Sequence, residues 1–150
     1  MNEPIWICKT FDALTVSELY NILKLRSEVF VVEQNCVYLD ADGKDIASHH
    51  LCGWLHNQLV AYCRILPPGL SYAEASIGRV LTHLAHRKDG YGKQLMLRAI
   101  EKTYALYDVA AIKIGAQQYL LAFYGNLGFK PVGESYLEDG IPHVTMIHHK

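Results

Sequence analysis

The residues of this sequence with the clearest chemical potential lie between Ile77 and Gly92. An apolar run with the features of a strand is followed by a loop that contains Gly90 and Gly92, and then by a segment with helical spacing. Such a loop directs several backbone N–H groups at one anion, and the N-terminus of the helix adds partial positive charge. The glycines let a phosphate approach the backbone, and Arg87 and Lys88 add full positive charges. The stretch therefore predicts a phosphate-binding loop.

Spacing excludes two common phosphate-binding motifs. A P-loop requires glycine at the position of Arg87, and Ser or Thr after Lys93, where Gln94 stands. A Rossmann fingerprint requires a third glycine at the position of Leu95. A glycine-rich turn also joins many strands to helices without binding a ligand, so the loop alone leaves both interpretations open.

Two motifs in this order resemble the GNAT N-acetyltransferase superfamily. Residues 87–92 (Arg-Lys-Asp-Gly-Tyr-Gly) resemble its Arg/Gln-x-x-Gly-x-Gly motif, and residues 123–129 (Phe-Tyr-Gly-Asn-Leu-Gly-Phe) resemble its F-Y-x-x-x-G-F segment. Further segments look like the ElaA-like branch of the superfamily, at residues 25–26, 29–34, 40–42, 115–117 and 138–143. The resemblance therefore spans nearly the whole chain.

The resemblance implies acetyl-CoA as the acetyl-donor cosubstrate and an amine as the acceptor. In that family the loop amides hold the pyrophosphate, and the backbone of the preceding strand pairs with the pantetheine arm. Gln117 stands where many members place an asparagine, and its amide can make the same contact with a longer reach. The implied cofactor-binding residues are Val80, Leu81, Thr82, Arg87, Lys88, Asp89, Gly90, Tyr91, Gly92, Lys93, Gln117 and Tyr124.

The resemblance also assigns Tyr124 as the general acid that protonates the departing CoA thiolate. The alternative role of Tyr124 is to pack its ring against the sheet. Backbone N–H groups near residues 80–82 would stabilise the oxyanion of the tetrahedral intermediate, which requires the sheet to open at that strand.

The general base is left open among Glu33, Glu74, His83 and an ordered water. A covalent route through a cysteine needs an adjacent base, and no motif provides one, so the sequence favours direct transfer. Glu33, Tyr38 and His143 are the residues we expect to contact the acceptor, with Tyr136 as a further candidate.

Charge is distributed unevenly along the chain, although the net charge is only −1. Residues 79–98 carry an excess of basic side chains that suits CoA phosphates, and residues 28–45 carry an excess of acidic ones. The acidic segment would attract a cationic amine, or it is an ordinary solvated loop.

The periodicity predicts a mixed α/β fold. The resemblance implies the GNAT (acyl-CoA N-acyltransferase) fold (α+β), with a mixed, largely antiparallel central sheet flanked by helices. Thr15 and Glu18 form a capping box that opens a helix to about Phe30. Strands are expected at residues 5–8, 50–55, 59–66, 75–82 and 110–115 and twice after Phe129, and further helices at 90–107 and 118–127.

The composition fits one domain over residues 1–150, because 51% of the residues are hydrophobic and no linker or repeat interrupts the chain. The near-neutral charge argues against nucleic acid as a partner, and no apolar run could span a membrane. The four cysteines lack C-x-x-C spacing and the histidines lack supporting ligands, so we expect free thiols and no metal in a soluble, cytoplasmic protein.

Three interpretations of function remain open. The first is direct transfer from acetyl-CoA to a primary amine of a small molecule or peptide. The second is a non-catalytic acetyl-CoA or acyl-CoA sensor on the same fold, and the third is a structural or partner-interaction domain. The sequence leaves the acceptor, the acyl-chain preference and the oligomeric state open, with a homodimer among the alternatives.

Overall fold

The computed structural model describes residues 3–150, which form two antiparallel sheets. The first sheet has the order β1-β2-β3-β4, and the second has the order β5-β7-β6. The expected α/β class with mainly antiparallel strands is confirmed. The strands are β1 (Ile5–Thr10), β2 (His49–Leu55), β3 (Gln58–Leu66), β4 (Ser76–Thr82), β5 (Ala111–Gln117), β6 (Lys130–Glu138) and β7 (Ile141–His149).

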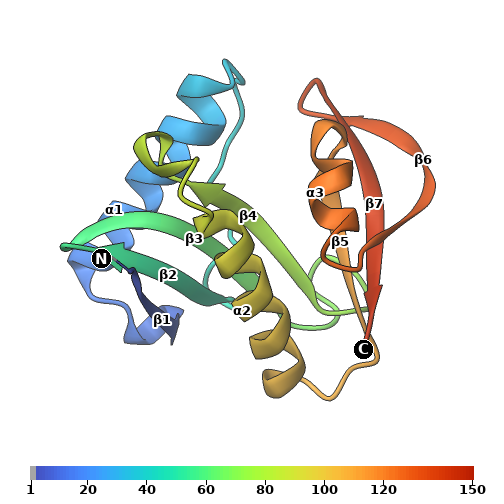
Figure 1. Ribbon diagram of the computed structural model, residues 1–150, viewed down its shortest axis with the longest axis horizontal. Helices are drawn as coiled ribbons and strands as arrows, with labels where there is room; N and C mark the ends of the chain where they lie inside the picture. Colours follow the sequence, from blue (N-terminus) through green and yellow to red (C-terminus); the bar gives the residue numbers. More distant parts are fainter. Residues whose placement is uncertain (1–2) are drawn as a thin grey trace.

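The two sheets touch at one end and diverge at the other. A parallel bridge joins Ala75 to Ile112, and the Lys113 N–H donates to the Ala75 carbonyl at 3.0 Å. From there β4 and β5 separate toward Thr82 and Gln117 (Figure 1). Among the described residues, β4 past this bridge pairs with a strand on its β3 side only. The sheet opening that oxyanion stabilisation requires is therefore present.

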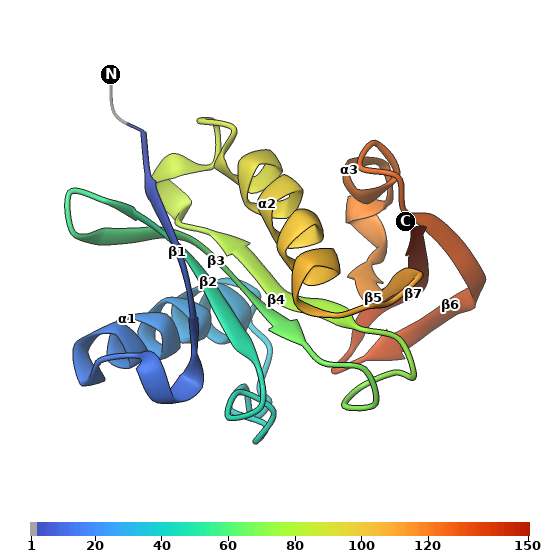
Figure 2. The same ribbon diagram turned by 90° about the horizontal axis from the view of Figure 1, so that it is seen from below.

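Helices cover both faces of the first sheet (Figure 2). The helix α1 (Val16–Arg26) lies on one face, and α2 (Tyr91–Leu106) lies on the other. The predicted capping box starts α1, since the Glu18 N–H donates to Thr15 Oγ1 at 3.0 Å and the Thr15 N–H donates to Glu18 Oε1 at 2.8 Å. The chain then continues as a π-helical segment, η2 (Ser27–Glu33), slightly beyond the predicted end of the helix.

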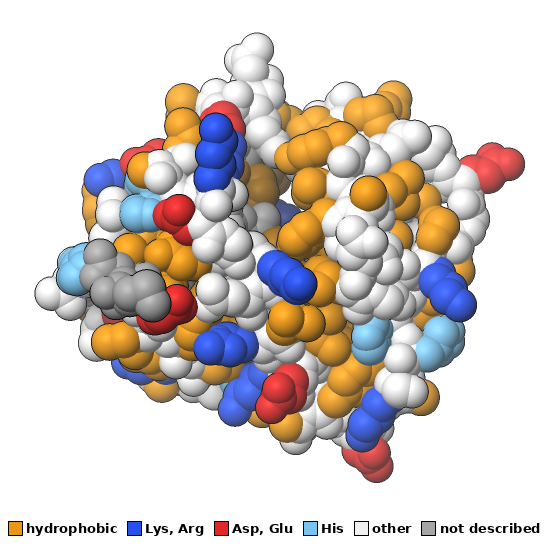
Figure 3. Space-filling view, in the orientation of Figure 1, with side chains coloured by type: hydrophobic (Ala, Val, Ile, Leu, Met, Phe, Trp, Pro, Cys, Tyr) orange, Lys and Arg blue, Asp and Glu red, His pale blue; other side chains and the backbone are white. Residues whose placement is uncertain are grey.

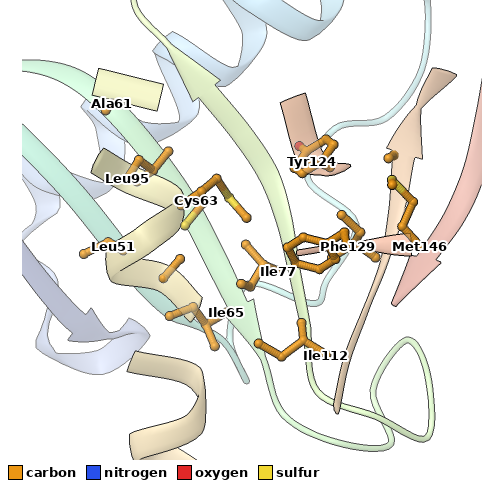
Figure 4. Packing of buried hydrophobic residues seen from close by; sticks show 14 of the residues in the cluster. Leu51, Ala61, Cys63, Ile65, Ile77, Leu95, Ile112, Tyr124, Phe129 and Met146 are labelled. Carbon is orange, nitrogen blue, oxygen red and sulfur yellow. The ribbon is translucent and has the colours of Figure 1, made fainter. Parts of the chain in front are cut away.

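The main core lies between α2 and the two sheets (Figure 4). Leu95 of α2 is fully buried, and the same cluster contains Ile77 of β4, Ile112 of β5 and Met146 of β7. Fully burying each such side chain is worth about 1.5–3 kcal/mol. The cluster thus spans both sheets and fixes the angle between them, which leaves their diverging ends free to form a site.

Two local features differ from the sequence-based expectation. The helix predicted at residues 118–127 is shorter, with one 3-10 turn, η4 (Gln118–Leu120), followed by α3 (Leu121–Gly125). Gly125, the last residue of α3, lowers the helix propensity of this segment. The strand β4 also carries a bulge, because Tyr62 pairs with Leu81 whereas Arg64 pairs with Gly78.

No helix among residues 3–150 is long and apolar enough to cross a membrane.

Candidate active site

A cleft of about 1070 Å³ occupies the space between the diverging strands β4 and β5. Figure 3 shows a hollow between the two halves of this face. Segment η2 and the loop after it line one side, and α3 and the β6–β7 hairpin line the other. The predicted site residues that line the cleft are Glu33, Tyr38, Val80, Leu81, Thr82, Arg87, Gly90, Gly92, Lys93, Gln117, Tyr124 and His143.

Three of the predicted loop residues are not in the cleft lining. Asp89 forms an ion pair with His86 at 3.1 Å, and Lys88 also lies outside the lining. The ring of Tyr91 is 6% exposed and belongs to the main core. Any contribution from Tyr91 to anion binding therefore has to come from its backbone.

The bulge on β4 gives the strand an unusual backbone at the cleft. Arg79 has a φ of +49°, a conformation that costs free energy in a residue with a side chain. A bulge interrupts the regular ladder and redirects the adjacent groups. Past the bridge at Ala75, β4 pairs with no strand of residues 3–150 on its outer side, and the bulge redirects its backbone groups there. An extended chain, such as a pantetheine arm, can therefore pair with this edge of β4.

The glycine loop fits an anion at the start of α2. Gly90 is the N-cap residue with a φ of +78°, and no side chain caps the helix there. A Cβ at Gly90 would meet no atom within 4 Å, so this side of the loop is open. Lys93 lines the cleft one turn into the helix. Backbone N–H groups, helix dipole and a lysine at one position are the features that favour a phosphate.

Arg87 is paired with Glu33 across the cleft opening. Both terminal guanidinium nitrogens donate to the carboxylate of Glu33, and Arg87 holds the pKa of that carboxyl below its ordinary value. The pair joins the glycine loop to η2. A phosphate that binds Arg87 has to compete with this carboxylate.

Tyr124 lies deep in the cleft with its ring packed edge-on against Phe123 and Phe129. The side chain is 6% exposed, and its hydroxyl has no hydrogen-bond partner among residues 3–150. Figure 4 shows the hydroxyl on the side of the ring away from Phe129. Burial raises the pKa of the phenol above its ordinary value, so the group is protonated at neutral pH. The ring therefore packs in the core while the hydroxyl remains available as a donor.

Two contacts connect the loop after η2 to the second sheet. The Gln34 amide donates to Gln117 Oε1 at 3.2 Å and accepts from Gln117 Nε2 at 3.3 Å. Cys36 Sγ donates to the carbonyl of Asp139 at 3.2 Å, in the β6–β7 turn. These contacts span the open end of the cleft, and Gln117 is thereby held at its rim.

Only one of the three carboxylate or histidine bases proposed from sequence lies in the cleft. Glu74 pairs with Lys113 at 3.6 Å outside the lining, and His83 accepts the Ala85 N–H at 3.1 Å, also outside it. Glu33 lines the cleft but is bound by Arg87. All four cysteines are free, and burial raises the pKa of the Cys52 and Cys63 thiols, so neither is an activated nucleophile.

The three aspartates of the acidic segment are paired with arginines within the fold, which corrects the hypothesis that they attract an amine by free negative charge. Asp40 and Asp45 bind the fully buried Arg26 at 2.8 and 2.7 Å. Asp42 binds Arg64 at 2.7 Å, and Arg79 binds Asp40 at 2.8 Å. The charges of these three aspartates are thus neutralised within the fold, and this network anchors the loop after η2 to β3 and β4.

Tyr38 belongs to the same network, because its hydroxyl donates to Asp40 Oδ1 at 2.8 Å and the Arg79 guanidinium lies 5.6 Å from its ring centre. Sequence reasoning missed Gln34, Arg79 and Glu138. Gln34 and Glu138 had a signal in the sequence, since both stand in segments that resemble the ElaA-like branch, whereas Arg79 was marked only by its charge. Glu138 and the predicted residue His143 lie on opposite strands of the β6–β7 hairpin.

The diverging sheets, the open edge of β4 and the glycine loop at the start of α2 together define the acyl-CoA N-acyltransferase fold. The chain belongs to the GNAT family, since the sequence model of the Acetyltransferase (GNAT) domain matches residues 27–149. It is 45% identical to the protein ElaA of Escherichia coli over 135 residues, which is 89% of this chain and 88% of ElaA.

Solved structures agree with this assignment. The crystal structure of ElaA from Escherichia coli superposes with a TM-score of 0.91 at 41% identity, covering 97% of this chain and 99% of that one. An acyl-CoA N-acyltransferase from Pseudomonas aeruginosa superposes with a TM-score of 0.90 at 45% identity, covering 96% and 99% of the two chains.

Proposed function

We propose that this protein is an N-acetyltransferase that transfers the acetyl group of acetyl-CoA directly to a primary amine of a small molecule or peptide. One observation carries the proposal: the unpaired edge of β4 and the unpartnered hydroxyl of Tyr124 line the same cleft. The first fits the pantetheine arm of a thioester, and the second is a proton donor for its sulfur. Family membership supports acyl-CoA as the class of donor.

The cleft divides into a donor side and an acceptor side in this proposal. The backbone of residues 80–82 and the loop at residues 87–93 hold the donor, with Lys93 and Arg87 on its phosphates and Gln117 on its amide groups. Tyr38 and His143 lie toward the acceptor. The N–H groups of the bulged β4 stabilise the oxyanion, an effect that is worth about 2.7–4 kcal/mol per donor in other enzymes.

In the proposed reaction, Tyr124 is the group through which a proton reaches the sulfur of CoA. A protonated amine must release two protons as its nitrogen attacks the thioester carbon and becomes an amide. When the C–S bond breaks, the thiolate takes a proton from Tyr124, and one proton from the nitrogen restores the phenol. The other proton passes to solvent, so the net products are the amide, the CoA thiol and one proton.

Two measurements on the full chain test the proposal. Calorimetry with acetyl-CoA must show saturable binding, and release of CoA thiol must depend on an added primary amine from a panel of small amines and a lysine peptide. Binding without amine-dependent release across the panel supports the sensor interpretation. The absence of binding contradicts both interpretations.

A further inference from the structure

We propose that His143 is the base that takes the proton from the acceptor ammonium, and that Glu138 is a positioning residue that stabilises the charged imidazole. The inference rests on the proposed function, and it names a residue and a class of acceptor for that site. The acceptor is a primary amine that is cationic in solution and enters between the β6–β7 hairpin and η2.

The hydrogen bond at one ring nitrogen of His143 fixes the role of the other. Nδ1 lies 2.7 Å from the carbonyl oxygen of Ile141. A carbonyl oxygen only accepts, so Nδ1 carries the proton, and the neutral ring has its lone pair on Nε2. Nε2 has no hydrogen-bond partner among residues 3–150. The atom that accepts a proton therefore makes no hydrogen bond within that range, and its charged neighbour is the Glu138 carboxylate at 3.5 Å.

The surroundings hold the ring in place. His143 is 7% exposed, and its ring stacks on Tyr136 with the centroids 5.9 Å apart and an interplanar angle of 28°. Its register partner on β5 is the uncharged Gln117, at the rim of the cleft. From β6, the carboxylate of Glu138 reaches within 3.5 Å of Nε2. The titratable groups that face His143 from these strands are thus Tyr136 and Glu138.

Gly115 extends this arrangement to Tyr72. A Cβ at Gly115 would lie 2.8 Å from the Tyr136 hydroxyl and 3.2 Å from that of Tyr72, so the absent side chain makes room for both. Tyr72, Glu138 and His143 line the cleft. A tyrosine hydroxyl and a carboxylate both accept hydrogen bonds, so Tyr72 and Glu138 suit an ammonium group.

His143 suits the proton transfer better than the other groups in the cleft. A primary ammonium of ordinary pKa, near 10, is almost fully protonated at neutral pH and cannot attack. A neutral imidazole carries a lone pair that can take this proton, and histidine is the side chain most often used for such a transfer. Glu33 is a weaker base, because Arg87 lowers the pKa of its carboxyl. Glu138 favours the imidazolium that forms, as a carboxylate does in other catalytic pairs.

The proton moves in a balanced sequence. Nε2 of His143 takes one proton from the ammonium, and the freed lone pair of the nitrogen forms the C–N bond while the carbonyl becomes an oxyanion. Collapse of that oxyanion breaks the C–S bond, with the second proton reaching sulfur by way of Tyr124. His143 then returns its proton to water.

The experiment compares wild type with His143→Gln, Glu138→Gln and the control His149→Gln, which changes an exposed histidine on the same strand. Amine-dependent thiol release is measured from pH 6 to 10 with benzylamine, spermidine and a lysine peptide. The acetyl-CoA Kd of each variant comes from calorimetry. Nitrogen-15 NMR of the imidazole rings in the wild type reports the tautomer of His143 without any substrate.

We expect His143→Gln to lower kcat/KM for the amine about 10²–10⁴-fold at pH 7, with an unchanged acetyl-CoA Kd. This loss shrinks as the pH approaches the pKa of the amine, because the neutral amine no longer needs a base. Glu138→Gln shifts the acid limb of the profile to lower pH, since the charged imidazole loses the carboxylate that lies 3.5 Å from Nε2. His149→Gln behaves as wild type.

A loss in His143→Gln that is the same at every pH overturns the proposal, since it indicates a packing role. If the acid limb of the pH profile lies at the same pH in Glu138→Gln and in wild type, Glu138 does not have the proposed role. If wild type binds acetyl-CoA but acts on no amine, the proposed function has failed, and the NMR tautomer then decides on His143. A proton on Nδ1 supports the assignment, and a proton on Nε2 of the neutral ring overturns it.

Discussion

The Arg87 guanidinium donates to both carboxylate oxygens of Glu33, which joins the glycine loop to η2 across the cleft. Exposed ion pairs of this kind contribute about 0.2–1 kcal/mol. The consequence for donor binding is larger than that for stability, because Arg87 cannot bind a phosphate and Glu33 fully at the same time.

Glu33→Gln should therefore increase the affinity for acetyl-CoA by up to about fivefold, the amount that corresponds to about 1 kcal/mol. Arg87→Gln should weaken binding, and the double variant should resemble Arg87→Gln. Calorimetry at low and moderate salt measures all three. Equal Kd values for wild type and both single variants would show that Arg87 does not contact the donor.

Gly92→Ala should affect stability and donor binding in opposite directions. A Cβ at Gly92 would make ordinary contacts, at 3.6 Å to Thr82 and 3.8 Å to Phe123, and alanine is favoured over glycine in a helix. We expect the free energy of unfolding to rise by about 0.5–1 kcal/mol while acetyl-CoA binds more weakly, because the methyl group enters the cleft. Urea denaturation and calorimetry separate the two effects, and tighter binding would argue against phosphate contact at this loop.

The buried Arg–Asp network should control stability rather than acceptor binding. Asp45→Asn leaves Arg26 and Arg64 without a shared carboxylate and should cost about 3–5 kcal/mol, whereas the exposed control Asp12→Asn should change little. Chemical denaturation measures the difference. A variant that folds with wild-type stability but binds cationic amines less tightly would restore the electrostatic steering hypothesis.

The same carboxylates predict acid sensitivity. Burial alone would raise the pKa of Asp45, but the hydrogen bonds and charges of Arg26 and Arg64 outweigh burial and lower it, and Arg64 acts likewise on Asp42. The folded pKa values lie below the unfolded value near 3.9, so the stabilisation is complete above that pH and is lost as the pH falls below it. Urea midpoints from pH 7 to pH 3 should drop steeply below pH 4 in wild type and less steeply in Asp45→Asn.

Gly115→Ala tests the acceptor side alone. The added Cβ would displace the hydroxyls of Tyr136 and Tyr72. The ring of Tyr136 stacks on that of His143, so its displacement would also move His143. We expect a loss of up to about 10²-fold in kcat/KM for the amine, with the acetyl-CoA Kd unchanged. A change in donor affinity instead would place these tyrosines on the donor side.

Features that depend on near neighbours in the sequence were predictable. The capping box of Thr15 and Glu18 is a local pattern, and the strands expected at residues 50–55 and 59–66 form the β2–β3 hairpin. The glycine loop was also visible, because its spacing is its signal. Gln117 and Tyr124 were named only because whole motifs matched a family.

Features that depend on distant residues were not predictable. Arginine is an unusual residue at positive φ, so nothing in the sequence marks the bulge at Arg79. The partners of Asp40 lie 14 and 39 residues away, at Arg26 and Arg79, so the acidic segment appeared solvent-facing in sequence. The orientation of the His143 ring depends on a carbonyl and a ring that only the folded hairpin provides.

The most direct test of the central claim is to measure amine-dependent CoA release and the acetyl-CoA Kd together in wild type and in Tyr124→Phe. Phenylalanine keeps the edge-on packing against Phe123 and Phe129 and removes only the hydroxyl. We predict that turnover by the variant falls about 10²–10⁴-fold while the Kd is unchanged. Equal turnover in the two proteins, with donor binding intact, would contradict the assignment of Tyr124 as the acid.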